Sequence, residues 1–194
     1  MHLDDQSILE AISRNTDRGY HHLVDAYADR VFSTCLNLTR NQEDAEDVTQ
    51  EVFTTIYLSL DSFEGNSKLS TWIYSIATNK CKEFLRKKTR KKRSGYHTEL
   101  EREDSHFIPL QIIDFQHPGV VLEDKERAKV LFSALEQLAE NQSIAYTLHK
   151  IEGRSYQEVA EMMEVSVSSV ESLLFRAKKR LQQLLEHYYQ ENLK

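Results

Sequence analysis

Apolar residues recur at helical spacing along most of the chain, and this period of about 3.6 residues predicts an all-α fold. Residues 5–39 read as two amphipathic helices, with expected core positions at Ile8, Leu9, Ile12, Leu23, Tyr27, Val31 and Leu38. Asn41 stands three residues before Asp44, a spacing typical of a helix start. The helix that follows carries an apolar stripe of Val48, Val52, Phe53, Ile56 and Leu60.

The segment from Leu69 to Arg93 is predicted to be a long helix with two different faces, entered through the Gly/Asn/Ser turn at Phe63–Lys68. Its apolar face consists of Leu69, Trp72, Ile73, Ile76, Ala77, Phe84 and Leu85. Its other face begins with hydroxyls and an amide and ends in cations, at Thr71, Ser75, Thr78, Asn79, Lys82 and Arg86.

The helical period fails between residues 94 and 124, an acidic stretch that contains both prolines of the chain. We interpret it as a flexible linker. The sequence therefore predicts two small helical domains, a bundle over residues 5–93 and a second domain over residues 125–190.

The second domain contains the pattern of a helix-turn-helix. Gly153 ends one helix, Ser155 with Glu158 forms a capping box, and Ser166 caps the next helix after a break at Glu164–Val165. The long last helix keeps Val167, Val170, Leu174, Ala177, Leu181 and Leu184 on its inner side. A short helix, a tight turn and a long helix with a polar outer face favour DNA binding. The alternative is two ordinary helices joined by a turn.

Charge is strongly segregated along the chain, although the net charge is only −6. Residues 1–79 hold 5 basic and 13 acidic groups, whereas residues 80–93 hold nine basic groups and one acid. Hydroxyls and amides can bond base edges, aromatic rings can stack on unpaired bases, and cations neutralise phosphates. The helix at 69–93 thus has the features of a nucleic-acid reader, and the acidic remainder predicts that strong DNA binding requires a partner.

The rest of the sequence argues against several classes of protein. No stretch approaches 18 uncharged apolar residues and the N-terminus is acidic, so we expect a cytoplasmic protein without membrane insertion. Cys35 and Cys81 stand alone in helical patterns and are expected to be buried free thiols. No metal spacing or cofactor motif is present. The acids at 43–47 also allow a phosphoryl-transfer enzyme, but no His, Lys or Gly-rich loop accompanies them, and an acidic helix face is usually a solvated face.

Two stretches in order resemble one family. DAEDVTQEVF followed by FEGNSKLSTWIYSIATNKCKEFLRKK is similar to the second conserved region of bacterial RNA polymerase sigma factors of the extracytoplasmic-function (ECF) group. SYQEVAEMMEVSVSSVESLLFRAKKRL is similar to the fourth region, and together the matches cover about residues 8–93 and 126–188. The resemblance implies a non-catalytic subunit whose partners are core RNA polymerase, promoter DNA in double-stranded and melted form, and an anti-sigma factor.

The resemblance also assigns roles to residues. The face that docks on the polymerase clamp would consist of Asp44, Asp47, Gln50 and Glu51. The face that opens the minus-ten element would consist of Phe63, Asn66, Ser67, Lys68, Ser70, Thr71, Trp72, Ser75, Asn79, Lys80, Lys82, Arg86 and Lys87. The residues that bind the minus-thirty-five element would be Arg154, Ser155, Tyr156, Ser166, Ser168, Ser169, Glu171, Ser172, Phe175, Arg176 and Lys179.

Three residues depart from the common pattern of this family. Glu171 and Leu173 stand where basic residues are frequent, and Glu164 stands in the turn where Gly is common. If Glu164 is left-handed, a strain of about 1 kcal/mol is expected. The competing interpretation of the whole chain is a helix-turn-helix regulator with an N-terminal sensor domain, which would bind its DNA without polymerase.

Overall fold

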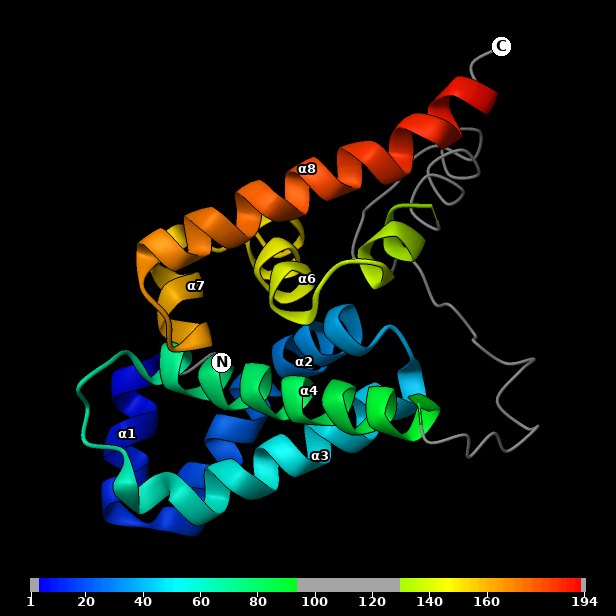
Figure 1. Ribbon diagram of the computed structural model, residues 1–194. Helices are drawn as coiled ribbons and strands as arrows, with labels where there is room; N and C mark the ends of the chain where they lie inside the picture. The colour runs from blue at the N-terminus through cyan, green and yellow to red at the C-terminus, as the bar shows by residue number, and fades with distance from the viewer. Residues whose placement is uncertain (1–3, 94–129, 193–194) are drawn as a thin grey trace, which may run out of the picture.

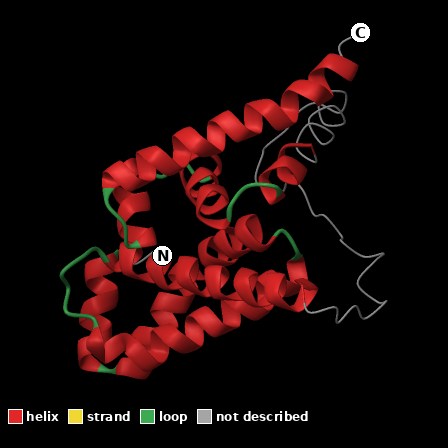
Figure 2. Cartoon of the chain, viewed as in Figure 1, coloured by secondary structure: helices red, strands yellow, loops and turns green. Residues whose placement is uncertain are grey.

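The computed structural model describes residues 4–93 and 130–192, and these residues form helices and short loops with no strand (Figure 2). The N-terminal lobe contains α1 (Asp5–Arg14), α2 (Thr16–Thr39), α3 (Gln42–Ser59), the 3-10 turn η1 (Leu60–Ser62) and α4 (Leu69–Arg93). The C-terminal lobe contains a helical segment at 130–136, then α6 (Glu140–Tyr146), the π-helical turn η3 (Thr147–Ile151), α7 (Tyr156–Met163) and α8 (Val167–Asn192). The predicted linker at 94–124 lies outside the described residues.

In the N-terminal lobe, α2, α3 and α4 pack as a bundle and α1 lies across the start of α2 (Figure 1). Gly19 makes this close crossing possible, because a Cβ there would lie 2.3 Å from the backbone nitrogen of Ile12. The stripe predicted on α3 is buried at Val48, Val52, Ile56 and Leu60. Cys35 and Cys81 are both buried free thiols, as predicted.

The predicted helix ends are confirmed by their hydrogen bonds. Asn41 Oδ1 accepts the backbone N–H of Asp44 at 2.9 Å, and Ser155 with Glu158 forms the complete capping box. Ser166 Oγ accepts the N–H of Ser169 at 3.2 Å. Glu164 adopts the left-handed conformation with φ 56°, so the strain expected from the sequence applies.

The two lobes pack against each other, an arrangement that the sequence left open. Buried apolar residues of α2, α3 and α4 form one continuous cluster with Ile144, Leu148, Val159, Met162 and Val170 of the C-terminal lobe. A smaller apolar cluster around Leu135, Ala177 and Leu181 lies within the C-terminal lobe. In Figure 1, α7 stands on the start of α4, and α6 lies above the end of α2 and the middle of α4. Within the described residues, no helix meets the length and apolarity that a bilayer crossing requires.

Candidate functional site

The outer face of α3 is an exposed acidic stripe. Asp47, Gln50 and Glu51 are exposed, and Thr54 continues the stripe one turn further along with its hydroxyl bonded to the Gln50 carbonyl at 2.8 Å. Their backbone is held by the buried stripe on the opposite side of the helix. The arrangement presents carboxylates and an amide on a rigid surface, as a protein-docking face requires.

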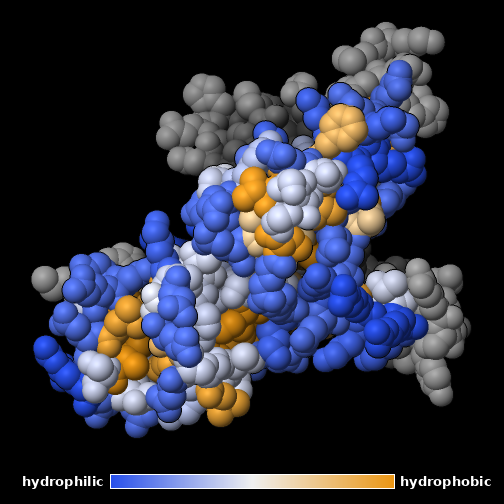
Figure 3. All heavy atoms as spheres, turned by 60° about the vertical axis from the view of Figure 1, so that its left-hand side comes forward, coloured by the Kyte–Doolittle hydropathy of each residue, from blue (hydrophilic) through white to orange (hydrophobic). Residues whose placement is uncertain are grey.

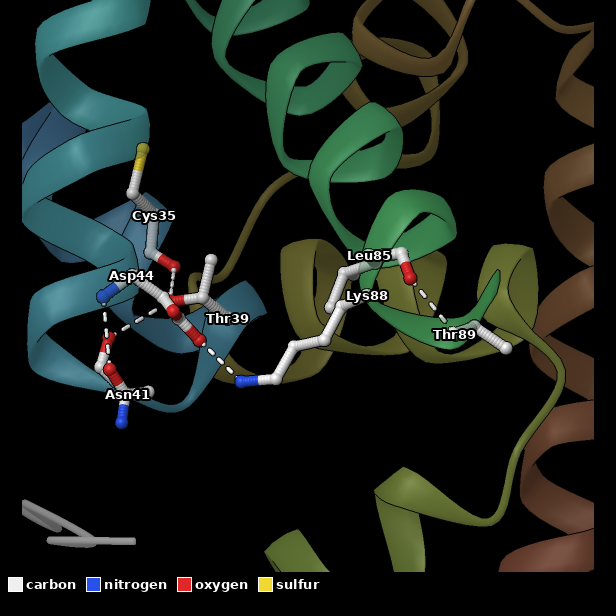
Figure 4. A network of polar contacts seen from close by, with 7 residues as sticks. All are labelled: Cys35, Thr39, Asn41, Asp44, Leu85, Lys88 and Thr89. Atoms are coloured by element: carbon white, nitrogen blue, oxygen red, sulfur yellow. Dashed lines mark hydrogen bonds and ion pairs between the residues drawn. The ribbon is translucent and has the colours of Figure 1, made fainter. Parts of the chain in front are cut away.

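Asp44 differs from the other acids of this face, because it already has a partner (Figure 4). Its carboxylate is half-buried and accepts Lys88 Nζ of α4 at 2.6 Å. Next to it, the Thr39 hydroxyl donates to the Cys35 carbonyl at 2.8 Å and so closes the end of α2. Asp44 therefore joins α3 to α4, a contact that the sequence analysis did not predict.

The loop before α4 projects from the N-terminal lobe. Gly65 adopts φ 74°, and Glu64 to Lys68 are all exposed. Asn66 Nδ2 donates to Glu64 Oε2 at 2.9 Å, so this part of the loop is bonded only to itself. At its base the Phe63 ring lies against Trp72, with centroids 5.1 Å apart. The loop thus has a fixed aromatic base and a free polar tip.

The polar face of α4 is narrower than predicted. Thr71 is only 7% exposed and Thr78 only 1%, so the prediction that they lie on an open face is wrong. The helical period continues through this region, but the lobe packs on both sides of the helix and covers these two hydroxyls. Ser70, Ser75, Asn79, Lys80 and Lys82 remain half-exposed, and Arg86 and Lys87 are exposed.

The outer face of α8 is open, as predicted from the helix-turn-helix pattern. The exposed residues are Ser166, Ser168, Ser169, Glu171, Ser172, Phe175, Arg176 and Lys179. Phe175 is 70% exposed, which is unusual for a phenylalanine and places an apolar ring in the middle of a polar surface. Leu173, one of the departures noted above, packs against the shared core.

Residues before α7 are divided between the surface and the contact between the lobes. Ser155 is occupied in the capping box, and Tyr156 is 39% exposed with its ring 4.7 Å from that of His149. Arg154, one of the residues assigned to the minus-thirty-five site, lies over the Tyr74 ring of α4 at 4.2 Å. The exposed apolar side chains form separate small areas on the mostly hydrophilic face of Figure 3.

Polar contacts also cross between the lobes, and sequence reasoning missed all of them. Asn79 Nδ2 donates to Glu164 Oε1 at 3.0 Å, and Arg86 Nε lies 3.0 Å from Glu140 Oε1. Arg40 donates to the Ser143 hydroxyl at 2.6 Å. These partners are 54 to 103 positions apart in the sequence, so no local pattern could have indicated them.

A buried carboxylate lies at the centre of this contact. Glu152 accepts the Thr34 hydroxyl at 3.0 Å and the Asn37 amide at 3.5 Å, both from α2. Burial raises the pKa of Glu152, whereas the hydrogen bonds from Thr34 and Asn37 and the charge of Arg154 lower it. The net direction is upward, so the contact between the lobes favours the protonated form.

Comparison with known proteins identifies the family. Residues 23–91 match the model of sigma-70 region 2, and residues 129–181 match that of sigma-70 region 4. The ECF RNA polymerase sigma-E factor of Haemophilus influenzae is 30% identical over 95% of this chain and 96% of its own length. That of Escherichia coli K12 is 31% identical, over 92% of this chain and 93% of its own.

Among solved structures, the sigma factor RpoE of Bartonella quintana, in complex with the anti-sigma factor NepR, has a similar fold. The TM-score is 0.63 at 23% identity, over 86% of this chain and 96% of that one. The two ordered family matches and the near full-length relatives agree with the two helical lobes. The chain belongs to the extracytoplasmic-function group of RNA polymerase sigma factors.

Proposed function

We propose that this sigma factor is a specificity subunit for promoter-directed transcription initiation and that it uses three surfaces for this function. The first is the acidic stripe of Asp47, Gln50 and Glu51 on α3, which binds a basic surface of core RNA polymerase. The exposure of all three side chains supports this role. Asp44 contributes by fixing the stripe to α4 through Lys88.

The second surface consists of the loop at 63–68 and the adjacent face of α4. Its free tip can enclose a base that leaves the duplex, and the Phe63–Trp72 pair offers an apolar floor. Extrusion of a base costs a few kcal/mol, which stacking and hydrogen bonds to the base edge offset. Asn79 has the donors and acceptor for such an edge, and the cations that follow it neutralise phosphates.

The third surface is the outer face of α8, which reads the minus-thirty-five element in the major groove. This face is the observation that carries the proposal, because it combines a capped helix N-terminus, exposed serines for base edges and cations two turns further along. Glu171 can accept a hydrogen bond from cytosine N4, whereas Lys179 suits a phosphate.

The chain is non-catalytic and acts in the cytoplasm with core polymerase. The two promoter elements lie about 25 base pairs apart, or roughly 85 Å. Residues 94–125 can extend to about 105 Å at roughly 3.3 Å per residue, which is sufficient to connect the lobes on DNA. An anti-sigma factor is a further expected partner, since the RpoE protein of similar fold was crystallised with one.

The test is co-purification of the chain with core polymerase, followed by run-off transcription on genomic fragments. The proposal expects stable association and new transcripts that start at defined positions. Tight, sequence-specific duplex binding by the chain alone, with no association with core, would favour the helix-turn-helix regulator instead.

A further inference from the structure

Four described residues adopt a left-handed backbone, and they are of two kinds. Gly65 and Gly153 are glycines, for which this conformation carries no steric cost. The other two, Arg40 with φ 59° and Glu164 with φ 56°, are not glycines. Arg40 follows the last turn of α2 and Glu164 follows the last turn of α7, positions where glycine is the usual residue. A side chain at each therefore strains its own helix end.

Both strained residues make a hydrogen bond between the lobes. The Glu164 carboxylate extends from the turn of the helix-turn-helix and accepts the Asn79 amide at 3.0 Å. The Arg40 guanidinium extends from the end of α2 and donates to the Ser143 hydroxyl of α6 at 2.6 Å. Within the described residues, Arg40 Nε is buried without a hydrogen-bond partner, and the negative charge of Glu136 favours the buried cation. Glycine would relieve the strain at either position but could not make the contact.

We propose that Arg40 and Glu164 are latch residues, which hold the C-terminal lobe of this chain on the face of α4 that reads the minus-ten strand. The two contacts lie at separate places, one on α4 and one at the end of α2, so together they fix the orientation of one lobe on the other. The apolar cluster shared by the lobes supplies non-directional affinity. The hydrogen bonds of the latch residues fix the orientation of the lobes. Backbone strain of this kind is retained in proteins at residues that have a function.

The latched form cannot engage a promoter. Asn79 is bonded to Glu164 and α7 packs against α4, so part of the proposed strand-reading face is occupied. A compact chain of 194 residues is roughly 40 Å across, whereas the two promoter elements are about 85 Å apart. Release of the latch therefore has to precede or accompany assembly on DNA. This consequence rests on the proposed function, whereas the latch itself concerns the free chain alone.

The test compares the distance between the lobes in the full-length chain and in two double variants. Dyes for resonance energy transfer are attached to cysteines introduced at the exposed residues Asp61 and Lys178. The native Cys35 and Cys81 are fully buried and do not compete for labelling. The first variant, Arg40→Gly with Glu164→Gly, removes both contacts and both strains. The second, Arg40→Lys with Glu164→Gln, keeps a donor and an acceptor on a strained backbone.

The glycine variant is expected to lower the ratio of closed to open molecules by about two- to tenfold per lost hydrogen bond. Its melting temperature should change little, because relief of strain at each helix end offsets part of the stability lost with the two hydrogen bonds. The Lys/Gln variant should remain as closed as the wild type. An unchanged distance distribution in the glycine variant would overturn the proposal.

Binding to core polymerase separates this inference from the proposed function. If the binding-competent form is the open one, the glycine variant should associate with core faster, by the factor by which its open fraction increases. Equal association rates, alongside a confirmed difference in the open fraction, would overturn the regulatory part of the proposal. If neither the wild type nor any variant bound core, the proposed function would be contradicted. The latch would then still be tested by the comparison of distances between the lobes.

Discussion

We expect packing of the lobes to depend on pH through the buried carboxylate of Glu152. Its side chain is 9% exposed and is bonded to Thr34 and Asn37 of the other lobe. In the open form these partners are lost and the group regains its ordinary hydration. Because burial raises the pKa of Glu152 in the closed form, that form binds a proton more tightly than the open form does.

The direction in which pH changes closure of the lobes follows from this difference between the closed-form and open-form pKa of Glu152. The contribution of Glu152 to closure is fully present below its ordinary open-form pKa and is lost as the pH rises through the raised closed-form pKa. Lowering the pH from about 7 to 5 should therefore tighten the closed form. Glu152→Gln removes the charge and keeps an acceptor for the Thr34 hydroxyl, so it should tighten closure at pH 7 and abolish this pH dependence.

Glu152→Ala should act in the opposite direction. The Thr34 hydroxyl is 2% exposed, and a buried hydroxyl left without its partner costs about 1–3 kcal/mol, which weakens closure by roughly five- to more than a hundredfold. The assay is energy transfer between the lobes of the full-length chain, at constant salt from pH 5 to 8. If Glu152→Gln retains the wild-type pH profile, or opens the chain as Glu152→Ala does, the reasoning from desolvation is refuted.

The remaining predictions concern the three proposed surfaces. Glu51→Lys should abolish binding to core polymerase while moving stability by less than about 0.5 kcal/mol, whereas Asp44→Ala should lower stability by about 0.5–1 kcal/mol because it breaks the ion pair to α4. Core pull-down with thermal unfolding separates the two. Asn79→Ala should reduce permanganate reactivity of promoter thymines in open complexes and alter the preferred minus-ten sequence; unchanged reactivity would place the reading surface elsewhere. Glu171→Gln should relax discrimination at one base pair by about 1–3 kcal/mol, and Lys179→Ala should flatten the log-affinity versus log-salt slope by about one unit. Both effects can be measured with a minus-thirty-five library at several salt concentrations. This orientation of α8 would be contradicted if Lys179→Ala changed base discrimination and Glu171→Gln changed the salt slope.

Local features of the fold could be predicted from the sequence because local chemistry determines them. The cap at Asn41 and the capping box at Ser155 each involve residues three positions apart, and both are present as expected. The break at Glu164–Val165 was likewise predicted from the helical period, whereas the left-handed conformation of Glu164 was considered only as a condition suggested by the family resemblance. The open face of α8 followed from the same period, because only one side of that helix carries a continuous apolar stripe.

Tertiary contacts could not be predicted, because they depend on how finished helices pack. Thr71 has the spacing of an exposed residue, yet neighbouring elements cover it. The ion pair of Asp44 joins residues 44 positions apart, and the Asn79–Glu164 bond joins residues 85 apart. Such pairs leave no periodic trace in a single sequence. The same holds for the contact of Arg154 with Tyr74, whose partners are 80 positions apart.

The most direct test of the account is the affinity of the full-length chain for promoter DNA with and without core polymerase, at matched salt. Acidic segments flank the cationic end of α4, and in the closed form Asn79 of the strand-reading face is bonded to Glu164, so the chain alone should bind duplex weakly. Addition of core should raise the affinity sharply and produce strand opening at the minus-ten element. Equal affinity with and without core would contradict the central claim that this chain recognises promoters only as a subunit of the polymerase.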